Sequence, residues 1–416
     1  MTLMSRRAFV AGSAGATLAT AAVAVPVATS VTGLRSLTSD AQPITSEEHE
    51  ARLHKLQSLM QQRGAAALLV EAGSSLEYFT GISWWRSERT TAALIPASGR
   101  PIVVTPFFEE PSIRETLKVE GDVRAWKEDA SPFELLGTAL REQTSAGALA
   151  VEPTTRFFIV EQVRHAAGVK RETVSGDDLV RACRTIKSPA ELALMQSANA
   201  VTIAALRHVH GALRAGMSGS EVQNLMIAAT EQLGGHHEFS LVLLNEASAF
   251  PHGSIKPQKV REGSVILIDT GCTVHGYQSD ISRSWVYGQP SARQREVWST
   301  VKRGQEIALE TAKIGVPVGA IDQAVRTFYE QHGWSRDYGL PGLSHRTGHG
   351  IGLDGHESPY LVRNDTTALQ PGMCFSDEPG LYIPGEFGIR LEDCWHMTDA
   401  GPKLFTPLAR SLEQPI

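Results

Sequence analysis

Residues 264–287 read SVILIDTGCTVHGYQSDISRSWVY, and this stretch decides the fold. An aliphatic, β-branched run ends in Asp269, a Val-His-Gly turn follows at 274–276, and a second strand-like pattern begins after it. Aliphatic runs that are bounded by turn residues are typical of paired strands. A hairpin whose centre lies between the first two turn residues places Asp269 directly opposite Asp280.

A second hairpin with the same design is expected near the C-terminus. Residues 373–378 and 387–392 flank a Pro-Gly-Glu turn at 384–386. A hairpin centred on the glycine of that turn places Glu378 opposite Glu392. The sequence therefore predicts the same arrangement twice, with two carboxylates facing each other across an antiparallel pair of strands.

An internal repeat supports this duplication. Five positions before the two hairpins recur at a constant spacing of 99 residues, and both copies end in Glu-Gln-x-Gly. The positions Gly216, Val222, Glu231, Gln232 and Gly234 recur as Gly315, Ile321, Glu330, Gln331 and Gly333. In each copy a helix, a short turn at a glycine and a second helix are expected, so the sequence predicts a pseudo-two-fold repeat.

Two facing pairs of carboxylates need a compensating interaction. Like charges about 4–5 Å apart cost roughly a few kcal/mol per pair at an effective dielectric constant of about 20. One acid of each pair could be protonated, both pairs could face solvent, or divalent cations could bind between them. The duplication favours cations, because two related halves can bring all four carboxylates around one centre.

Residues 345–357 read HRTGHGIGLDGHE and contain three histidines and four glycines. His345 and His349 have the i, i+4 spacing of a zinc-binding helix. The glycines make a helix unfavourable, since each costs about 1 kcal/mol relative to alanine. The stretch instead predicts an extended, closely packed segment in which the backbone can approach a ligand.

The first thirty residues are typical of a targeting segment. Arg6 and Arg7 precede a stretch rich in Ala, Gly, Val and Thr, and small residues suited to cleavage occur at 22–24. This pattern resembles a twin-arginine export signal, with an N-terminal membrane anchor as the alternative. We expect a signal peptide at 1–30, a linker at 31–45, a periplasmic or secreted protein, and no stable membrane anchoring after cleavage.

The composition is that of a globular protein. Of 416 residues, 42% are hydrophobic and 20% are charged, and the formal net charge is −6. This profile excludes a disordered or polytopic membrane protein, and the acidic excess argues against nucleic acid as a partner. In a chain of this size the cysteines are expected to be buried free thiols. These are Cys183, Cys272, Cys374 and Cys394.

The chain between the linker and the repeat predicts an α/β domain. The expected elements are a helix at 46–63, strands at 65–70, 76–81, 92–96 and 101–107, and helices at 133–143 and 160–167. A long helix then begins at Ser188, whose side chain can cap it, with Pro189 at its first position. We therefore expect an N-terminal domain at 46–180 and a second domain at 181–416.

Taken together, the motifs resemble those of the pita-bread metallopeptidases. The matching segments are His252-Gly253, Asp269-x-Gly271, Asp280-x-Ser282-Arg283, residues 345–357, Glu378-Pro379-Gly380 and Arg390-Leu391-Glu392-Asp393. Within this family the chain is most similar to the Xaa-Pro dipeptidase (prolidase) and aminopeptidase P branch, and creatinase shares the fold. The resemblance covers about 46–416. It implies a creatinase-type α/β N-terminal domain and an α+β pita-bread catalytic domain with an internal pseudo-two-fold repeat.

The resemblance also implies a site with two divalent metal ions per chain. Asp269 would bind the first ion, Asp280 and Glu392 would bridge, and His349 and Glu378 would complete the second site. Such a hard ligand set favours Mn²⁺, with Co²⁺ or Zn²⁺ as alternatives. A water that bridges the two ions would become the hydroxide nucleophile.

The same resemblance assigns catalytic roles around these ligands. Glu378 would shuttle a proton from the nucleophile to the leaving amine. His252 and His356 would stabilise the tetrahedral oxyanion, and His345 would line the pocket. Arg390 would hold either a carboxylate behind the metal ions or the substrate.

Substrate recognition is implied at two further positions. Arg363 lies near the place where prolidases bind the C-terminal carboxylate of the substrate, with a solvated loop arginine as the alternative. Trp84, or the adjacent Trp85, would reach the active site of a partner subunit, with an ordinary loop aromatic as the alternative. A family tyrosine near the metal is replaced around Glu238-Phe239. The partners implied are a small peptide substrate and a second copy in a homodimer or dimer of dimers.

The expected function is hydrolysis of Xaa-Pro dipeptides, or removal of the first residue from longer Xaa-Pro peptides. A metal-dependent hydrolase or lyase of a small non-peptide amide or osmolyte remains an alternative on the same scaffold. A catalytically inactive binding module is a third. Inactive relatives lose metal ligands, whereas all five positions are filled here.

Overall fold

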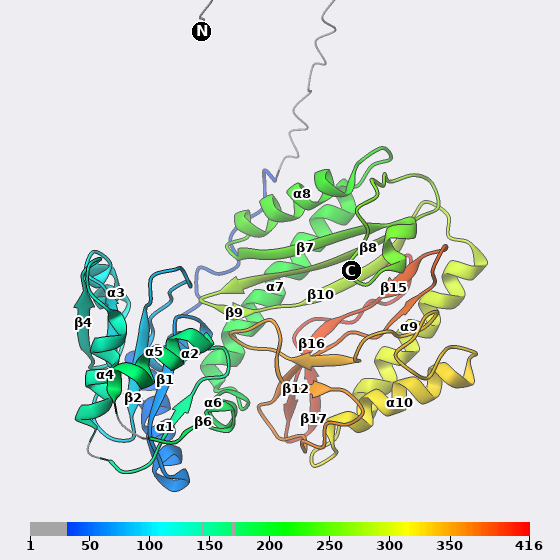
Figure 1. The fold of residues 1–416 in the computed structure, drawn as a ribbon. Helices are drawn as coiled ribbons and strands as arrows, with labels where there is room; N and C mark the ends of the chain where they lie inside the picture. The colour runs from blue at the N-terminus through cyan, green and yellow to red at the C-terminus, as the bar shows by residue number, and fades with distance from the viewer. Residues whose placement is uncertain (1–30, 144, 169–170) are drawn as a thin grey trace, which may run out of the picture. The chain divides into compact units, whose positions relative to one another are not determined.

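The computed structural model describes residues 31–143, 145–168 and 171–416, so the export signal predicted at 1–30 lies outside the described residues. From residue 46 onward the chain forms an α/β lobe, here the N-terminal lobe, followed by an α+β lobe, here the C-terminal lobe (Figure 1). Within these described ranges, no helix is long and apolar enough to cross a membrane.

The N-terminal lobe is built on a six-stranded mixed sheet with the order β4-β3-β2-β1-β5-β6. Its central strand β1 pairs in antiparallel with β2 and in parallel with β5, and every residue of β1 is buried. Its elements are α1 (Ser46–Arg63), β1 (Ala65–Glu71), α2 (Ser74–Thr80), β2 (Ala92–Pro96), β3 (Ile102–Pro106), α3 (Glu110–Thr116), β4 (Asp122–Trp126), α4 (Pro132–Glu142), β5 (Ala148–Val151), α5 (Phe157–Ala167), β6 (Thr173–Ser175) and α6 (Asp177–Arg184).

The strand predicted at 76–81 is wrong, because α2 is a helix. Leu76, Phe79 and Thr80 are fully buried, which is the i, i+3, i+4 pattern of a helix with one apolar face. The helix ends at Gly81, which adopts a left-handed conformation with φ 79°. A short apolar run does not by itself distinguish a strand from such a helix.

The segment predicted as a linker packs against the C-terminal lobe. The backbone N–H of Leu37 donates to the carbonyl of Leu233, at the end of α8, and Ile44 lies in that lobe's core. At the other boundary, Cys183 belongs to the N-terminal core. The packing of the N-terminal lobe therefore extends a few residues past 180.

The predicted repeat is visible in the helices of the C-terminal lobe. Helices α8 and α10 begin and end at positions that differ by 99 residues, so the duplicated helix–turn–helix unit is confirmed. The first half contains α7 (Pro189–Ala212), α8 (Gly219–Gln232), β7 (His236–Leu244), the 3₁₀ helix η1 (Asn245–Ala249), β8 (Ser264–Val274), β9 (Tyr277–Gln278) and β10 (Ile281–Tyr287). The second contains α9 (Ala292–Thr311), α10 (Val318–Gln331), β11 (Gly348–Gly350), β12 (Glu357–Leu361), β13 (Cys374–Asp377), β14 (Gly380–Tyr382), β15 (Gly388–Arg390), β16 (Asp393–Thr398) and β17 (Gly401–Leu404).

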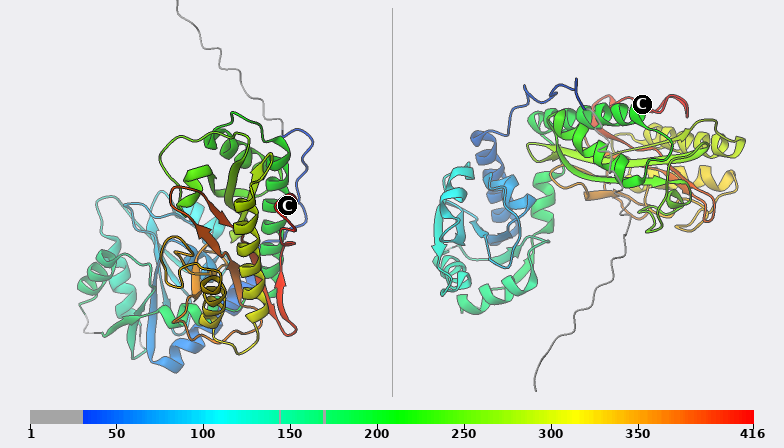
Figure 2. Two further views of the ribbon diagram at one scale, coloured as in Figure 1. Left: turned by 90° about the vertical axis from the view of Figure 1, so that its right-hand side faces the viewer. Right: turned by 90° about the horizontal axis from the view of Figure 1, so that it is seen from above.

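Strands of both halves converge in this lobe. One sheet has the order β10-β8-β7, a second has the order β12-β11-β13-β16-β17, and β14 pairs with β15. Helices α7 and α8 contact β8 and β7, and α9 contacts β13, with the helices gathered on one side of the strands (Figure 2). The four cysteines are free and buried, as predicted.

Candidate metal centre

The first acidic hairpin turns at His275 and Gly276. Val274 pairs with Tyr277, which leaves these two residues as the turn. Both have positive φ, 47° at His275 and 82° at Gly276, as two-residue hairpin turns require. The turn therefore lies one residue later than expected.

This turn shifts the strand register by two residues. Asp269 on β8 pairs with Ser282 on β10, so the prediction that Asp269 lies directly opposite Asp280 is wrong. Because side chains alternate with a period of two, the shift leaves Asp280 on the same face, diagonally across from Asp269. The two carboxylates still meet, since both belong with Glu392 to a group whose ligand atoms lie within 4.8 Å of one another.

The second acidic hairpin has the predicted register. Asp377 pairs with Asp393, and Gly380 pairs with Arg390. The strand pairs β13–β16 and β14–β15 therefore have the same register, and a short gap lies between them. Glu378 and Glu392 occupy this gap and lie opposite each other. The opposition of these two glutamates is confirmed.

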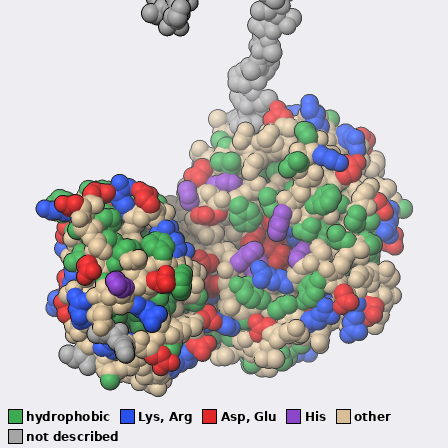
Figure 3. Space-filling model, viewed as in Figure 1, with side chains coloured by type: hydrophobic (Ala, Val, Ile, Leu, Met, Phe, Trp, Pro, Cys, Tyr) green, Lys and Arg blue, Asp and Glu red, His purple; other side chains and the backbone are tan. Residues whose placement is uncertain are grey.

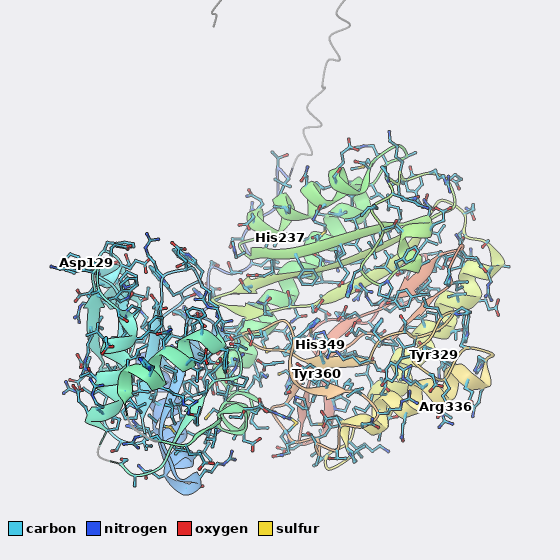
Figure 4. All side chains as sticks on the ribbon, viewed as in Figure 1. Asp129, His237, Tyr329, Arg336, His349 and Tyr360 are labelled. Atoms are coloured by element: carbon cyan, nitrogen blue, oxygen red, sulfur yellow. The ribbon has the colours of Figure 1, made fainter. Side chains whose placement is uncertain are left out.

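His349 lies on β11 (Figure 4), and one of its ring nitrogens faces the carboxylates. Its Nδ1 atom lies 3.0 Å from the carbonyl oxygen of Gly350, which assigns the proton to Nδ1. Its Nε2 atom lies 3.6 Å from Asp280 Oδ2, 3.5 Å from Glu378 Oε1 and 3.9 Å from Glu392 Oε1. The unprotonated Nε2 is thus free to bind a cation. The extended conformation predicted for this segment is confirmed.

The five predicted ligands form two overlapping groups. Asp269, Asp280 and Glu392 form one, His349, Glu378 and Glu392 form the other, and each set of ligand atoms lies within 4.8 Å. Buried oxygens Oδ1 of Asp280 and Oε1 of Glu392 have no hydrogen-bond partner. Unpartnered buried oxygens are costly unless something binds them. The donor set therefore fits two hard divalent cations that share Glu392.

The protonation behaviour of the site leads to the same conclusion. Burial raises the pKa of Glu378 from 4.5 to about 8. Burial and the neighbouring charges of Asp269 and Glu378 raise the pKa of Asp280 well above its ordinary value. Burial, followed by the charge of Asp280, does the same to the pKa of Glu392. Positive charge at this place would keep all three carboxylates ionised.

Arg390 joins the two hairpins behind the ligands. Its Nη2 donates to Asp269 Oδ2 at 2.6 Å, its Nε to Ser282 Oγ at 2.9 Å, and its Nη1 to the hydroxyl of Tyr382 at 2.9 Å. The Ser282 hydroxyl lies 2.9 Å from Asp269 Oδ1 and 2.8 Å from Glu392 Oε2, and donates its one proton to one of them. One buried network thus fixes carboxylates of both halves.

The network shows one of the two roles predicted for Arg390. The residue is 3% exposed, and all three guanidinium nitrogens meet protein acceptors, so Arg390 holds the carboxylate of Asp269. It also lines the pocket, so the predicted contact with substrate stays a prediction.

Sequence reasoning missed Ser282 and Tyr382. Ser282 could have been found, because it lies two residues after Asp280 and therefore on the same strand face. Tyr382 lies four residues after Glu378 in the predicted hairpin, so the same rule places it on the face of Glu378.

A pocket of about 920 Å³ opens onto the ligands. His252, His345 and His356 line it, so the structure brings all three predicted catalytic histidines to the site. The ring centroid of His356 lies 3.9 Å from that of His349. Histidine, acidic and basic side chains gather at one place on the face shown in Figure 3.

His345 is held by protein groups at both ring nitrogens. Its Nε2 lies 2.7 Å from the hydroxyl of Tyr382, and its Nδ1 lies 2.7 Å from the carbonyl oxygen of Arg346. Burial is the largest cause that lowers the pKa of His345, to about 3. The side chain is therefore neutral near pH 7 and forms a fixed part of the pocket wall.

Arg363 and Trp84 do not line this pocket. Arg363 pairs with Asp337 at 3.1 Å and stacks on the ring of Tyr338, with its guanidinium carbon 4.8 Å from the ring centroid. Tyr338 lines the pocket, so Arg363 lies behind a lining residue. Trp84 stacks on Trp85 and lines a different cavity of about 620 Å³.

An ionic cluster braces the loop that carries His356. Glu357, the next residue, pairs with Arg184 at 2.7 Å and also with Lys187. Arg184 pairs with Asp354 at 2.9 Å, on the other side of His356. Sequence reasoning missed this cluster, because its cations lie more than 160 residues before its acids and only the tertiary fold brings them together.

Comparison with known proteins agrees with this fold and site. Residues 52–186 match the Creatinase/Prolidase N-terminal domain, and residues 193–399 match Metallopeptidase family M24. The Xaa-Pro dipeptidase of Lactobacillus helveticus is 30% identical over 374 residues, which cover 87% of this chain and 98% of that protein.

Solved structures give the same result. Dipeptidase PepE from Mycobacterium ulcerans superposes with a TM-score of 0.79 and 30% identity, covering 88% of this chain and 97% of its own. The X-Pro aminopeptidase from Thermotoga maritima superposes with a TM-score of 0.76 and 28% identity, covering 86% and 98%.

An α/β lobe followed by an α+β lobe that holds a cluster of hard metal ligands defines a metal-dependent hydrolase of the pita-bread class. The chain belongs to metallopeptidase family M24 and carries the creatinase/prolidase N-terminal domain. The resemblance stated from the motifs, the fold class and the assignment as a metallopeptidase are therefore confirmed.

Proposed function

We propose that this metallopeptidase hydrolyses the Xaa-Pro bond of dipeptides or of the N-terminus of longer peptides, with two Mn²⁺ ions per chain. The observation that carries the proposal is the pair of overlapping ligand groups that share Glu392 and contain unpartnered buried oxygens. The names of the relatives, an Xaa-Pro dipeptidase and an X-Pro aminopeptidase, support the substrate class. A ligand set of four carboxylates and one imidazole favours Mn²⁺, with Co²⁺ or Zn²⁺ as replacements.

The site residues divide the chemistry among them. Divalent cations, when bound, supply Lewis acidity toward the scissile carbonyl and an acidified water as nucleophile. Glu378 is 14% exposed at its side chain and lines the pocket, so it can pass a proton from the nucleophile to the leaving amine. His252 and His356 line the same pocket, where their N–H groups can stabilise the oxyanion that develops on the carbonyl oxygen.

A peptide panel tests the proposal. The purified enzyme with Mn²⁺ is assayed on Xaa-Pro dipeptides, on longer Xaa-Pro peptides and on matched Xaa-Ala dipeptides, with Glu378→Gln as the inactive control. We expect Mn²⁺-dependent cleavage of the proline substrates, at least about 10-fold faster than of the alanine dipeptides. Equal or preferred cleavage of Xaa-Ala would refute the substrate class. No hydrolysis of any peptide would favour the small-amide or osmolyte alternative.

We also propose an exported, homodimeric enzyme. The Arg6-Arg7 pair supports export by the twin-arginine route to the periplasm or the medium. Exposed aromatic side chains on the N-terminal lobe, Trp85 at 67% and Phe107 at 59%, support an interface with a second copy, or a dimer of dimers. The net charge of −6 argues against nucleic acid as a partner. Mass spectrometry of the exported protein and light scattering test these proposals, and an uncleaved monomer would contradict both.

A further inference from the structure

A second pair of acids lies behind the metal centre. Asp377 on β13 pairs with Asp393 on β16, and both residues are fully buried. Each adjoins a predicted ligand, because Asp377 precedes Glu378 and Asp393 follows Glu392. Side chains alternate along a strand, so Asp377 points to the opposite face from Ser376, whose hydroxyl accepts the backbone N–H of His349. The acid pair therefore lies on the face away from the metal centre.

One acid of this pair is fully compensated. Asp393 Oδ1 accepts from Arg283 Nη2 at 2.6 Å and from the hydroxyl of Thr406 at 2.9 Å. Asp393 Oδ2 accepts from Gln305 Nε2 at 2.9 Å. Arg283 and Asp393 are both fully buried, so their charges balance in a closed pair.

The other acid has no such partner. Both carboxylate oxygens of Asp377 are buried without a hydrogen-bond partner, and among the described residues no cation pairs with it within 4.0 Å. The nearby ammonium group of Lys302 lies 3.7 Å from Glu306 instead. A buried carboxyl group is strongly unfavourable unless its oxygens are paired or bound, and neither oxygen of Asp377 meets a donor or a cation among the described residues. Burial, followed by the charge of Asp393, raises the pKa of Asp377 well above its ordinary value.

Two further buried oxygens beside Asp377 also lack partners. These are Oε1 of Gln305 on α9 and the hydroxyl of Tyr329 on α10, of which Tyr329 is labelled in Figure 4. Gln305 is held next to the acid pair by its bond to Asp393. The hydroxyl of Tyr329 packs closely against Gly304, the residue before Gln305 on α9. Burial, followed by the charge of Asp377, raises the pKa of Tyr329. Four unpartnered oxygens thus belong to one buried region.

We propose that Asp377, Gln305 and Tyr329 bind a monovalent alkali cation, K⁺ or Na⁺, at a site separate from the divalent centre. The region offers four unpartnered buried oxygens but only one acid among them, which suits a monovalent cation better than a divalent one. Carboxylate, amide and phenol oxygens are hard ligands of the kind that alkali and alkaline-earth cations prefer. The ion would fix the β13–β16 pair from which Glu378 and Glu392 emerge. The proposal does not depend on the substrate proposed above.

The first experiment compares thermal unfolding of the full chain in KCl, NaCl and choline chloride at equal ionic strength. EDTA keeps divalent ions out of the comparison. We expect the Tm to be about 2–4 °C higher with K⁺ or Na⁺ than with choline, and the increase to saturate with concentration. Asp377→Asn and Asp377→Val should lose this difference, whereas Asp129→Asn, an exposed control on the N-terminal lobe, should keep it.

A second experiment uses the unaltered protein, so that it does not depend on the folding of a variant. Crystals soaked in RbCl should show an anomalous peak among the oxygens of Asp377, Gln305 and Tyr329. A water without anomalous signal at that place would overturn the proposal. So would equal Tm values in the three salts, or a salt-specific shift that persists in Asp377→Asn. A salt-specific Tm difference that appears in Lys302→Met but not in the unaltered protein would show that Lys302, and not an ion, compensates Asp377. That outcome would also overturn the proposal.

Discussion

Nη2 of Arg390 lies 2.6 Å from Oδ2 of Asp269, although the two residues come from opposite halves of the repeat. The guanidinium also donates to Ser282 and Tyr382, so its plane is fixed by three different acceptors. A planar group with several donors can orient a carboxylate in a way that a single ammonium cannot. The arginine therefore sets the direction in which Asp269 presents its oxygens.

The first prediction concerns this contact. Arg390→Lys keeps the charge but loses the fork of donors, so we expect Mn²⁺ affinity to fall about 10–100-fold. Calorimetric titration with Mn²⁺ measures the effect, and excess Mn²⁺ should restore much of the activity. Arg363→Lys is the matched control, because Arg363 pairs with Asp337 and stacks on Tyr338 and does not itself line the pocket. Equal affinity in the two variants would contradict the positioning role of Arg390.

Asp280 supplies a second prediction. Its Oδ1 atom is buried and unpartnered, and it belongs with Asp269 and Glu392 to one ligand group. Asp280→Asn replaces a carboxylate by a neutral amide, so we expect loss of metal and at least about 100-fold loss of kcat. Metal content and turnover are measured together, with Asp399→Asn on the surface as the control. Turnover like that of the wild type would exclude Asp280 as a metal ligand.

A variant at His356 should lose catalysis without losing metal. His356 lies against His349 and lines the pocket with an exposed edge. It also forms a third candidate group with Asp280 and His349, but the two groups that contain Glu392 are complete without it. We expect His356→Ala to retain its metal and to lose about 10²–10³-fold in kcat, as when an oxyanion donor is removed. An unchanged kcat would remove His356 from the catalytic groups. His332→Ala, at an exposed position on the far end of α10, should behave like the wild type.

The hairpins show how far the sequence could be read. The Pro-Gly-Glu turn fixed the register of Glu378 and Glu392 correctly, because the centre of that turn is unambiguous. The register of Asp269 was wrong by two residues, because a turn of His275 and Gly276 requires positive φ at a histidine, which the sequence does not signal. Because side chains alternate along a strand, a shift of two residues leaves Asp269 and Asp280 on one face. The two acids therefore still meet as predicted.

Other parts of the site depend on long-range contacts. The hydroxyl of Tyr382, on β14, lies between Arg390, on β15, and His345, which lies in a loop. Arg184 reaches Glu357 across 173 residues of sequence. No local pattern encodes this last pair, because it forms only once both lobes are packed. The position of Arg363 in the sequence predicted a place in the substrate pocket. In the structure Tyr338 lies between Arg363 and the pocket.

The raised carboxylate pKa values predict the pH dependence of metal binding. In the metal-free protein the pKa of Glu378 is about 8 against an ordinary 4.5, so the folded state binds more protons than the unfolded state between these values. Stability of the metal-free protein should therefore fall as pH rises through this range, and protons should compete with cations at its lower end. We expect the increase in Tm on adding Mn²⁺ to be larger at about pH 8 than at about pH 6. Equal increases at both pH values would contradict this assignment.

The account depends most directly on the two overlapping ligand groups, and metal analysis tests them. The protein is purified without chelator and its metal content is measured by mass spectrometry beside its peptidase activity. We expect about two divalent ions per chain, loss of activity on chelation, and recovery with Mn²⁺. A fully active protein without bound metal would contradict the account.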